Sequence, residues 1–396
     1  MNIVVFGLTI SSSWGNGHAT LWRGLCKALA RLGHRVVFFE RDVPYYASAR
    51  DWPSLPDGDL VLYGGWAAVC ARAKCELVCA DAAIVTSYCP DALRAANLVF
   101  EAAAPVSIFY DLDTPVTLSR LRRGEAVPYV GERGLRDYEL VLSYTGGAAL
   151  EELRCSMGAR RVRPLYGHVD PDVHRPAPAT PQYRADLSWL GTYAADRQGM
   201  LEMLFVDVAR RRPDLRFLIG GAQYPEDFPW TSNVYFVQHL PPQEHAAFFC
   251  SSRLTLNVTR AAMARMGWCP SGRLFEAAAC GAVLLSDEWS GLGDFYAPGS
   301  EILLAHDTAD ALCALDRCDE ELLRIARAAR ARTLDEHTCH HRARLLVELI
   351  EQARSPSRLP AQGGCSLDAY HGPQTPYPGA YTDSGRDPGR GSHPGS

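Results

Sequence analysis

Residues 2–40 read NIVVFGLTISSSWGNGHATLWRGLCKALARLGHRVVFFE and contain the pattern that decides the fold. The apolar runs at 3–6 and 36–40 are rich in β-branched and aromatic residues, which favour strands. Between them, residues 19–32 repeat apolar side chains at helical spacing, and Gly33 marks the end of the helix. A strand, a helix and a second strand in this order predict a parallel βαβ unit.

The same alternation continues to about residue 165, breaks, and then starts again. The further strands expected in the first half cover residues 60–63, 83–86, 106–110, 140–143 and 162–165. Prolines interrupt the pattern over 166–181, where they fix φ and remove backbone donors, so this stretch is typical of a linker. The strands expected in the second half cover residues 187–190, 217–220, 234–237, 254–258, 283–286 and 302–304. Helices that include 196–212 and 243–249 lie between them.

We therefore expect an α/β protein of two tandem Rossmann-like domains, for which a chain of 396 residues is long enough. The first domain is expected over 1–170, a linker over 171–181 and the second domain over 182–354. A nearly continuous helical pattern over 310–353 is expected to close the second domain. Residues 355–396 are rich in Pro and Gly and poor in aliphatic side chains, so we predict a disordered tail.

Charge and hydropathy narrow the classes of partner. The formal net charge of −5 lacks the basic excess that binding to a phosphate backbone needs, so a nucleic-acid partner is not favoured. The N-terminus has no charged leader before its apolar run, and no apolar stretch approaches the roughly 20 residues that span a bilayer. We expect a cytoplasmic location with at most peripheral membrane contact.

The cysteines and histidines do not form a metal-binding pattern. Thirteen cysteines are scattered along the chain, where a reducing compartment would keep them as thiols. Neither group with suggestive spacing has the paired C-x-x-C or acidic partners of a zinc site: Cys70, Cys75, Cys79 and Cys89, and the run 337–341. We predict no metal site and read 337–341 as a junction between helices.

The strongest chemical signal is residues 269–286, which read CPSGRLFEAAACGAVLLS. Ser271 and Gly272 begin a predicted helix whose free N–H groups and positive dipole end suit an anionic diphosphate. Arg273 and Glu276 lie three residues apart on one face of that helix, and the carboxylate can accept hydrogen bonds from two ribose hydroxyls. The alternative is an ordinary amphipathic helix with a surface Glu–Arg pair.

The motif R-x-F-E-A-x-A-C-G-x-x-x-L-S in this stretch resembles the ribose-binding helix of GT-B glycosyltransferases, and more closely that of the CgeB-like (spore-maturation-type) family. The resemblance implies two Rossmann-like domains facing each other across a cleft and a metal-independent transfer from a nucleoside-diphosphate sugar. The donor would lie on the second domain and the acceptor would enter from the first. One position departs from the pattern: many retaining members have an acidic residue eight positions before the ribose glutamate, and here that position is Trp268.

Three other stretches are similar to GT-B chains. Residues 166–176 resemble the turn that enters the second domain. Gly191 and Arg197 lie in a stretch that resembles the first donor-domain loop, in which a basic side chain meets the diphosphate. Gly221 ends another expected strand, where a glycine permits close approach of a base or ribose.

The loop between the first strand and the first helix contains Gly15, Asn16 and Gly17 and resembles the GT-B loop that faces the donor across the cleft. Its glycines do not have the G-x-G-x-x-G spacing of a dinucleotide fingerprint, so NAD binding is not favoured. His18 follows directly. It is a candidate for general base or for binding of the transferred sugar, and a capping or buried histidine is the alternative.

Asp111, Leu112 and Asp113 follow the strand expected at 106–110. They are similar to the D-x-D metal site of GT-A transferases, but those chains do not normally carry a second tandem α/β half. Thr114 and Pro115 suggest instead that Asp113 caps a helix. We expect Asp111 to face the cleft, where it is a secondary candidate for deprotonating the acceptor, and we expect no metal dependence.

The sequence thus predicts a glycosyltransferase whose co-substrate is a nucleoside-diphosphate sugar. Two other classes remain open. A GT-B epimerase or hydrolase would use the same nucleotide site without an acceptor, and a non-catalytic sugar-binding or assembly protein would bind nucleotide weakly or not at all.

Overall fold

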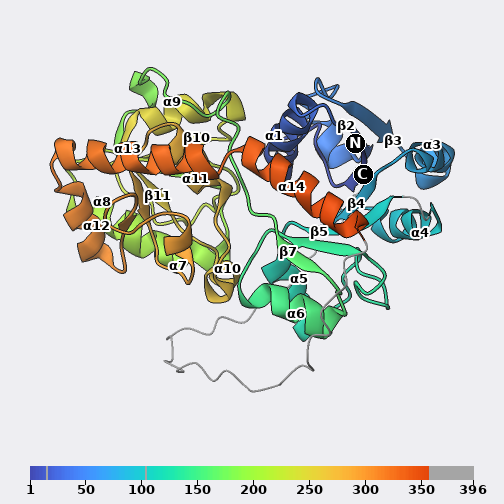
Figure 1. The fold of residues 1–396 in the computed structure, drawn as a ribbon. Coiled ribbons are helices and arrows are strands. Elements are labelled where there is room, and N and C mark those ends of the chain that lie inside the picture. The colour runs from blue at the N-terminus through green and yellow to red at the C-terminus, as the bar shows by residue number, and fades with distance from the viewer. Residues whose placement is uncertain (15–16, 103–104, 356–396) are drawn as a thin grey trace, which may run out of the picture. The chain divides into compact units, whose positions relative to one another are not determined.

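The first sheet, drawn in blue to green in Figure 1, is seven-stranded and parallel throughout. The computed structural model describes residues 1–14, 17–102 and 105–355. The strands are β1 (Asn2–Gly7), β2 (Arg35–Arg41), β3 (Asp59–Tyr63), β4 (Ala82–Thr86), β5 (Val106–Asp111), β6 (Leu140–Ser143) and β7 (Val162–Pro164). Their order is β3-β2-β1-β4-β5-β6-β7, so the chain reverses direction across the sheet after β3, and every predicted strand of this half is present.

Helices cover both faces of this sheet. They are α1 (His18–Arg31), α2 (Pro44–Ala47), α3 (Trp66–Val78), α4 (Ala92–Ala102), α5 (Thr114–Arg122) and α6 (Ala148–Met157). The buried side chains of α3, α4, α5 and α6 pack on one face in a single apolar cluster. Those of α1 pack on the other face. Covering both faces explains why the strands are apolar along their whole length rather than in alternation.

The second sheet is six-stranded and also parallel. Its strands are β8 (Ala185–Leu190), β9 (Phe217–Gly221), β10 (Val234–Gln238), β11 (Ser252–Asn257), β12 (Leu284–Ser286) and β13 (Leu303–Leu304), in the order β10-β9-β8-β11-β12-β13. The helices of this half are α7 (Gln198–Leu201), α8 (Asp207–Arg211), α9 (His245–Cys250), α10 (Ala261–Met266), α11 (Gly272–Ala279), α12 (Thr308–Leu315) and α13 (Asp319–Glu336). The helix predicted over 196–212 includes a π-helical segment, Glu202–Val206, between α7 and α8.

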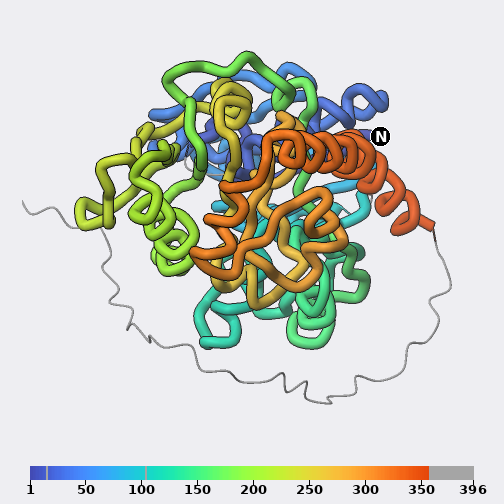
Figure 2. The backbone as a smooth tube through the Cα atoms, turned by 90° about the vertical axis from the view of Figure 1, so that its left-hand side faces the viewer, coloured from blue at the N-terminus to red at the C-terminus, as the bar shows by residue number. Residues whose placement is uncertain are grey.

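The last helix leaves the second domain. The pattern over 310–353 leads to α12, α13 and α14 (Cys339–Arg354), but only the first two close the second domain. Helix α14 packs along α1 and buries Ala343, Leu346 and Ile350 in the apolar cluster of the first sheet. It is the orange-to-red helix that ends the coloured chain in Figures 1 and 2. Arg354 Nη1 at its end contacts Asp81 Oδ1 at 2.7 Å, and Asp81 Oδ2 accepts a hydrogen bond from the Asn2 N–H at 2.8 Å. The expectation that this whole stretch closes the second domain is therefore wrong for α14.

The chain crosses between the two sheets twice, and the two crossings are paired. The Val169 N–H donates to the His337 carbonyl at 3.0 Å, and the Cys339 N–H donates to the Val169 carbonyl at 2.8 Å. The run 337–341 is thus the junction of α13 and α14, as predicted. No helix in the described ranges is long and apolar enough to cross a membrane. The predicted disordered tail lies, from residue 356 onward, outside the described residues.

Candidate functional site

A cleft of about 490 Å³ opens where the carboxyl ends of the strands of the two sheets meet. From the first domain it is bordered by the loop after β1 and the start of α1, and from the second by the segments after β8, β9 and β11 and the start of α11. The predicted donor-site residues all line it: Gly191, Arg197, Gly221, Ser271, Gly272, Arg273 and Glu276. The end of the strands is where open α/β sheets bind ligands.

Two arginines share one indole ring in this cleft. The guanidinium carbon of Arg273 lies 4.3 Å from the centroid of the Trp189 ring, and that of Arg197 lies 5.0 Å from it. Trp189 is completely buried in β8, and its Nε1–H donates to the Tyr224 hydroxyl at 2.7 Å. A fixed aromatic face of this kind attracts cations, so Trp189 holds both guanidinium groups in place.

Neither arginine of this pair has an ion-pair partner among the described residues. Arg273 Nη1 donates to the Asn257 amide oxygen at 3.1 Å, and an Arg197 Nη2–H donates to the Thr192 carbonyl. In the described part of the chain, no carboxylate lies within ion-pair distance of either guanidinium. Burial, and secondarily the charge of Arg197, lower the pKa of Arg273 to about 9. Burial also lowers the pKa of Arg197, and an added anion would favour the charged form of both groups.

Gly191 makes room for this pair. A Cβ atom at Gly191 would lie 2.8 Å from Trp189 Cζ2, 2.9 Å from Arg273 Nη2 and 3.2 Å from Arg197 Nη2. At Gly221 a Cβ atom would lie 2.1 Å from the Gly191 carbonyl oxygen. Both glycines are therefore required by close approach, one to the arginines and the other to the neighbouring backbone.

Helix α11 points its N-terminus into the same cleft. Ser271 is the N-cap, with extended backbone, and its side chain makes no capping hydrogen bond. Glu276, one turn into the helix, lines the cleft, and its Oε2 lies 3.9 Å from His245 Nδ1. The first turns of α11 thus bring free N–H groups, Arg273 and the Glu276 carboxylate to the cleft.

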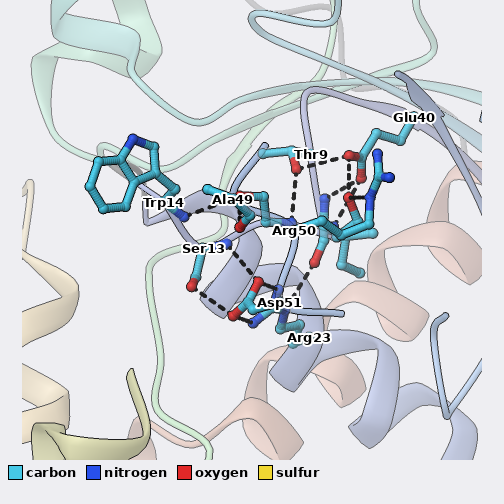
Figure 3. A network of polar contacts seen from close by, with 11 residues as sticks. Thr9, Ser13, Trp14, Arg23, Glu40, Ala49, Arg50 and Asp51 are labelled. Atoms are coloured by element: carbon cyan, nitrogen blue, oxygen red, sulfur yellow. Dashed lines mark hydrogen bonds and ion pairs between the residues drawn. The ribbon is translucent and has the colours of Figure 1, made fainter. Parts of the chain in front are cut away.

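A buried carboxylate on β2 holds the loop after β1 in place (Figure 3). Glu40 is completely buried and accepts hydrogen bonds from the Thr9 hydroxyl, the Ile10 N–H, and both the N–H and hydroxyl of Ser11, at 2.6–3.0 Å. Four donors to one carboxylate fix the course of the loop. Gly17 at the end of this loop lines the cleft, whereas Gly15 and Asn16 lie outside the described residues.

A second anchor of the same loop is the ion pair of Arg23 with Asp51. The Arg23 guanidinium contacts both Asp51 oxygens, at 2.9 and 2.6 Å, and Asp51 also accepts hydrogen bonds from the Ser13 N–H and hydroxyl (Figure 3). Burial acts to raise the pKa of Asp51, but the hydrogen bonds from Arg23 and Ser13 outweigh it and lower the pKa to about 2. Trp14 follows in the chain and lies against the His239 ring, with centroids 4.0 Å apart.

His18 lies in the cleft, and Asp111 does not. Burial lowers the pKa of His18 to about 4, so its imidazole is neutral at pH 7. Asp111 is completely buried and does not line the cleft: its Oδ1 accepts hydrogen bonds from the Asp113 N–H and the Thr117 hydroxyl. The expectation that Asp111 faces the cleft is wrong, because the chain turns after β5 and places Asp113 there instead.

Asp113 is the N-cap residue of α5, as predicted, but its side chain makes no capping hydrogen bond. Its Oδ2 accepts a hydrogen bond from the Tyr88 hydroxyl at 3.0 Å, and its Oδ1 is buried with no hydrogen-bond partner in the described chain. Burial raises the pKa of Asp113. A cleft-facing carboxylate with an unused oxygen is an acceptor for a ligand hydroxyl.

Trp268 does not line the cleft. Its Nε1–H donates to Asp294 Oδ2 at 2.6 Å. Its ring packs so closely on Gly147 that a Cβ atom added to this glycine would lie 2.5 Å from Trp268 Cε3. The Gly146 N–H donates to the Trp268 carbonyl at 2.9 Å. Position 268, where many retaining GT-B members have an acidic residue, is thus used in this chain for a contact between the two domains.

Several residues of the site are not apparent from the sequence. Trp189 lies inside an apolar strand pattern, and nothing in that pattern marks it as a platform for cations. His174 and His245 are 71 positions apart, yet together with Glu276 they form the one group of three donor side chains in the described ranges that could hold a metal ion. Only the fold brings these residues together.

Comparison with known proteins agrees with this architecture. Residues 197–348 match the family model described as glycosyl transferase-like. Sucrose-phosphate synthase from Thermosynechococcus elongatus superposes with a TM-score of 0.63 at 13% identity, over 89% of this chain and 98% of that chain. No curated protein sequence matches the chain.

Two other solved structures carry nucleotides. The Anabaena HepE protein in complex with UDP and glucose has a TM-score of 0.62 at 12% identity, over 89% of this chain and 100% of that chain. An Escherichia coli structure described as trehalose-6-phosphate bound with UDP-2-fluoro glucose has a TM-score of 0.57 at 13% identity, over 89% and 97%. At these identities the likeness is one of fold: two Rossmann-like domains in the GT-B arrangement.

Proposed function

We propose that this chain is a glycosyltransferase that takes a sugar from a nucleoside diphosphate and passes it to an acceptor entering from the first domain. The proposal is supported by the GT-B fold, by the glycosyl transferase-like segment 197–348 and by the charges of the cleft. UDP is the first nucleotide to consider, because HepE is described in complex with UDP-glucose.

The observation that carries the proposal is the arginine pair on Trp189. The two guanidinium groups have no ion-pair partner among the described residues, and they hold positive charge in a largely buried place. A diphosphate supplies the opposite charge, and its oxygens match the forked donors of arginine. We place the diphosphate on Arg197 and Arg273, with the N–H groups at Ser271 and Gly272 as further donors.

The rest of the donor follows from this placement. Glu276 lies beyond Arg273 along α11, so we assign it to the ribose hydroxyls. Gly191 and Gly221 lie beside the arginines where a side chain has no room, so the nucleotide approaches the backbone there.

During transfer, the bond between the anomeric carbon and the diphosphate oxygen breaks, and negative charge develops on the leaving diphosphate. Arg197, Arg273 and the start of α11 are already oriented toward that charge and stabilise it most strongly in the transition state. Because this positive charge is supplied by the chain, we propose that the reaction requires no metal ion.

On the acceptor side we assign His18 and Asp113. His18 is neutral and lines the cleft, and Asp113 has a buried oxygen without a hydrogen-bond partner in the described chain. Each can accept the proton of an acceptor hydroxyl. Asp113 thus takes the role that the sequence suggested for Asp111.

The experiment is isothermal titration of the purified full-length chain with UDP and with pyrophosphate. Replacing Arg273 with Ala, or Arg197 with Ala, should weaken both ligands by about 10–100-fold, since a charge-assisted hydrogen bond contributes roughly 1.5–3 kcal/mol. Glu276→Gln should weaken UDP and leave pyrophosphate unchanged, because only UDP has a ribose.

Arg184→Ala is the matched control, because Arg184 is exposed and does not line the cleft. Unchanged UDP affinity in both cleft arginine variants would overturn the donor site. Incubation with UDP-glucose alone separates the enzyme classes: an epimerase or hydrolase converts it, whereas a transferase requires an acceptor. The CgeB-like branch and the cytoplasmic location remain predictions.

A further inference from the structure

A cluster of three donor side chains lies beside the ribose end of the cleft. His174 belongs to the stretch between the domains, His245 begins α9, and Glu276 lies in α11. One ligand atom from each lies within 4.8 Å of the other two. His245 and Glu276 line the cleft, and His174 lies behind them, 1% exposed. Three separate elements thus converge on one point.

The hydrogen bonding of His245 shows which nitrogen is available. Its Nε2 lies 3.3 Å from the Leu240 carbonyl oxygen, which can only accept, so Nε2 carries the hydrogen. Nδ1 is then a lone pair, and it lies 3.9 Å from Glu276 Oε2 and has no hydrogen-bond partner in the described chain. A lone pair and a carboxylate oxygen repel each other unless a positive centre lies between them.

His174 shows the same deficit more strongly. Both of its ring nitrogens are buried and have no hydrogen-bond partner among the described residues. A buried polar group without a partner costs roughly 1–3 kcal/mol. The His174 and His245 rings lie beside each other, with centroids 5.8 Å apart. The cluster thus brings together three side chains that can each donate an electron pair to a metal ion.

We propose that His174, His245 and Glu276 bind a divalent ion of the zinc class. Two imidazoles and one carboxylate are a known ligand set for zinc, whereas magnesium and calcium prefer oxygen ligands alone. The Leu240 carbonyl then acts as the outer partner that orients His245. Ligand atoms around a tetrahedral ion are ~3.3 Å apart, so small side-chain rotations must close the present 4.8 Å spread.

The ion occupies an open site, because three ligands leave one tetrahedral position toward the cleft. It engages the carboxylate that we assign to the ribose, so zinc and the nucleotide exclude each other. This consequence rests on the proposed function, whereas the metal site itself does not. Zinc is therefore an inhibitor of donor binding in this chain and takes no part in transfer.

The metal site is tested first without nucleotide. Purified full-length chain is freed of metal with a chelator and titrated with Zn²⁺ by calorimetry and with Co²⁺ by absorption. We expect one tetrahedral Co²⁺ spectrum without sulfur-to-metal charge transfer. Such charge transfer would instead indicate that the ion binds exposed thiols such as Cys75 and Cys313, which are the competing ligands. Absence of such a spectrum in the wild-type chain would overturn the proposal. Misfolding of a variant cannot explain that result, because the wild-type chain itself is measured.

His174→Gln removes one ligand and keeps a polar side chain. It should weaken Zn²⁺ by more than the ~10–100-fold that loss of an outer-shell partner costs. The matched control is His306→Ala, because the imidazole of His306 is exposed and lies 3.7 Å from Glu288 Oε2, away from the cluster, and this variant should bind Zn²⁺ as the wild type does. Equal zinc affinity in the three proteins would refute the site. Thermal melting shows whether His174→Gln is folded, and His245→Gln provides a second ligand variant.

Competition is tested last. In chelator, UDP binding by the wild-type chain tests the donor site alone. With rising Zn²⁺, the apparent UDP affinity should fall in the wild type and in His306→Ala, and zinc should have no such effect in His174→Gln. UDP binding that zinc leaves unchanged would overturn the competition while leaving the donor site standing. Failure to bind UDP even in chelator would overturn the proposed function, with the metal result unaffected.

Discussion

At the scale of single residues, Gly191 is a tightly constrained position of the cleft. Replacing it with Ala places a methyl group 2.8 Å from the ring of Trp189, which is completely buried and has no room to move. The guanidinium groups of Arg197 and Arg273 must then shift off the indole. We expect UDP affinity to fall by about 10-fold or more, as for loss of one charge-assisted hydrogen bond, with ~1–3 kcal/mol of overpacking strain.

Calorimetric titration with UDP measures the effect, and thermal melting measures the strain. The control is Gly199→Ala in α7, where an added Cβ atom meets nothing within 4 Å. That variant should bind UDP normally and be slightly more stable, because alanine favours helix. If Gly191→Ala binds UDP as tightly as Gly199→Ala does, the arginines do not depend on the space at this glycine.

The sequence predicts some residues of this site and not others, for a physical reason. Arg273 and Glu276 share one helix, so helical spacing alone places them on one face. Trp189 and His174 reach the site because segments far apart in the chain pack together, and the spacing of residues within one segment does not predict such contacts. Asp111 and Asp113 show the limit within three residues: Asp111 ends β5 and Asp113 follows it, and only the turn after β5 decides which carboxylate reaches the cleft.

At the scale of elements, the buried carboxylate of Glu40 positions the loop after β1. Glu40→Gln keeps the shape but replaces one accepting oxygen with an NH₂ group, which faces N–H and hydroxyl donors (Figure 3). Loss of such charged hydrogen bonds costs roughly 1.5–3 kcal/mol. Since Ser13 and Gly17 of this loop line the cleft, we expect weaker substrate binding together with a looser loop.

Hydrogen exchange is the measurement, because the Ile10 and Ser11 amides donate directly to Glu40. They should exchange faster in Glu40→Gln, while amides of β8 and β11 in the second sheet should not. Glu76→Gln is the control: Glu76 pairs with Arg35 away from the cleft. Equal exchange at residues 10 and 11 in both variants would show that Glu40 is not what holds the loop.

The elements also show where local pattern is sufficient. The parallel strands are predicted well because β-branched runs buried on both faces have few alternatives. The helix predicted over 196–212 contains a π-helical segment at Glu202–Val206, and periodicity of 3.6 residues does not anticipate such an insertion. The sequence of α14 likewise does not indicate which domain the helix packs on, since an amphipathic helix can bury its apolar face on either sheet.

At the scale of the whole molecule, the buried Arg342 contacts both of the paired crossings that join the two domains. Arg342 Nη2 lies 3.1 Å from His337 Nδ1, and Arg342 Nε donates to the Tyr166 carbonyl at 3.2 Å. Burial, and secondarily the charge of Arg342, lower the pKa values of His168 and His337 to about 3. Both histidines are neutral in the folded protein.

The sign of the pH dependence follows from these pKa values. An unfolded histidine has a pKa near 6.5, so between about pH 6.5 and 3 the unfolded chain binds more protons than the folded chain. Stability therefore falls as the pH decreases through this range, by up to ~1.4 kcal/mol per pH unit for each such histidine. We expect the melting temperature to fall between pH 7 and pH 5.

His337→Gln isolates the contribution of the crossing. Glutamine can accept from Arg342 but does not titrate, so the decrease of the melting temperature from pH 7 to pH 5 should be smaller than in the wild type, even if the variant starts lower at pH 7. The control is His306→Gln, which is exposed and should retain the wild-type pH dependence. A His337→Gln chain that loses stability with acid as steeply as the wild type would show that the crossing is not acid-sensitive. The acid response of the molecule would then come from groups elsewhere in the fold, and the junction of the two domains would be held by its backbone pairing and packing alone.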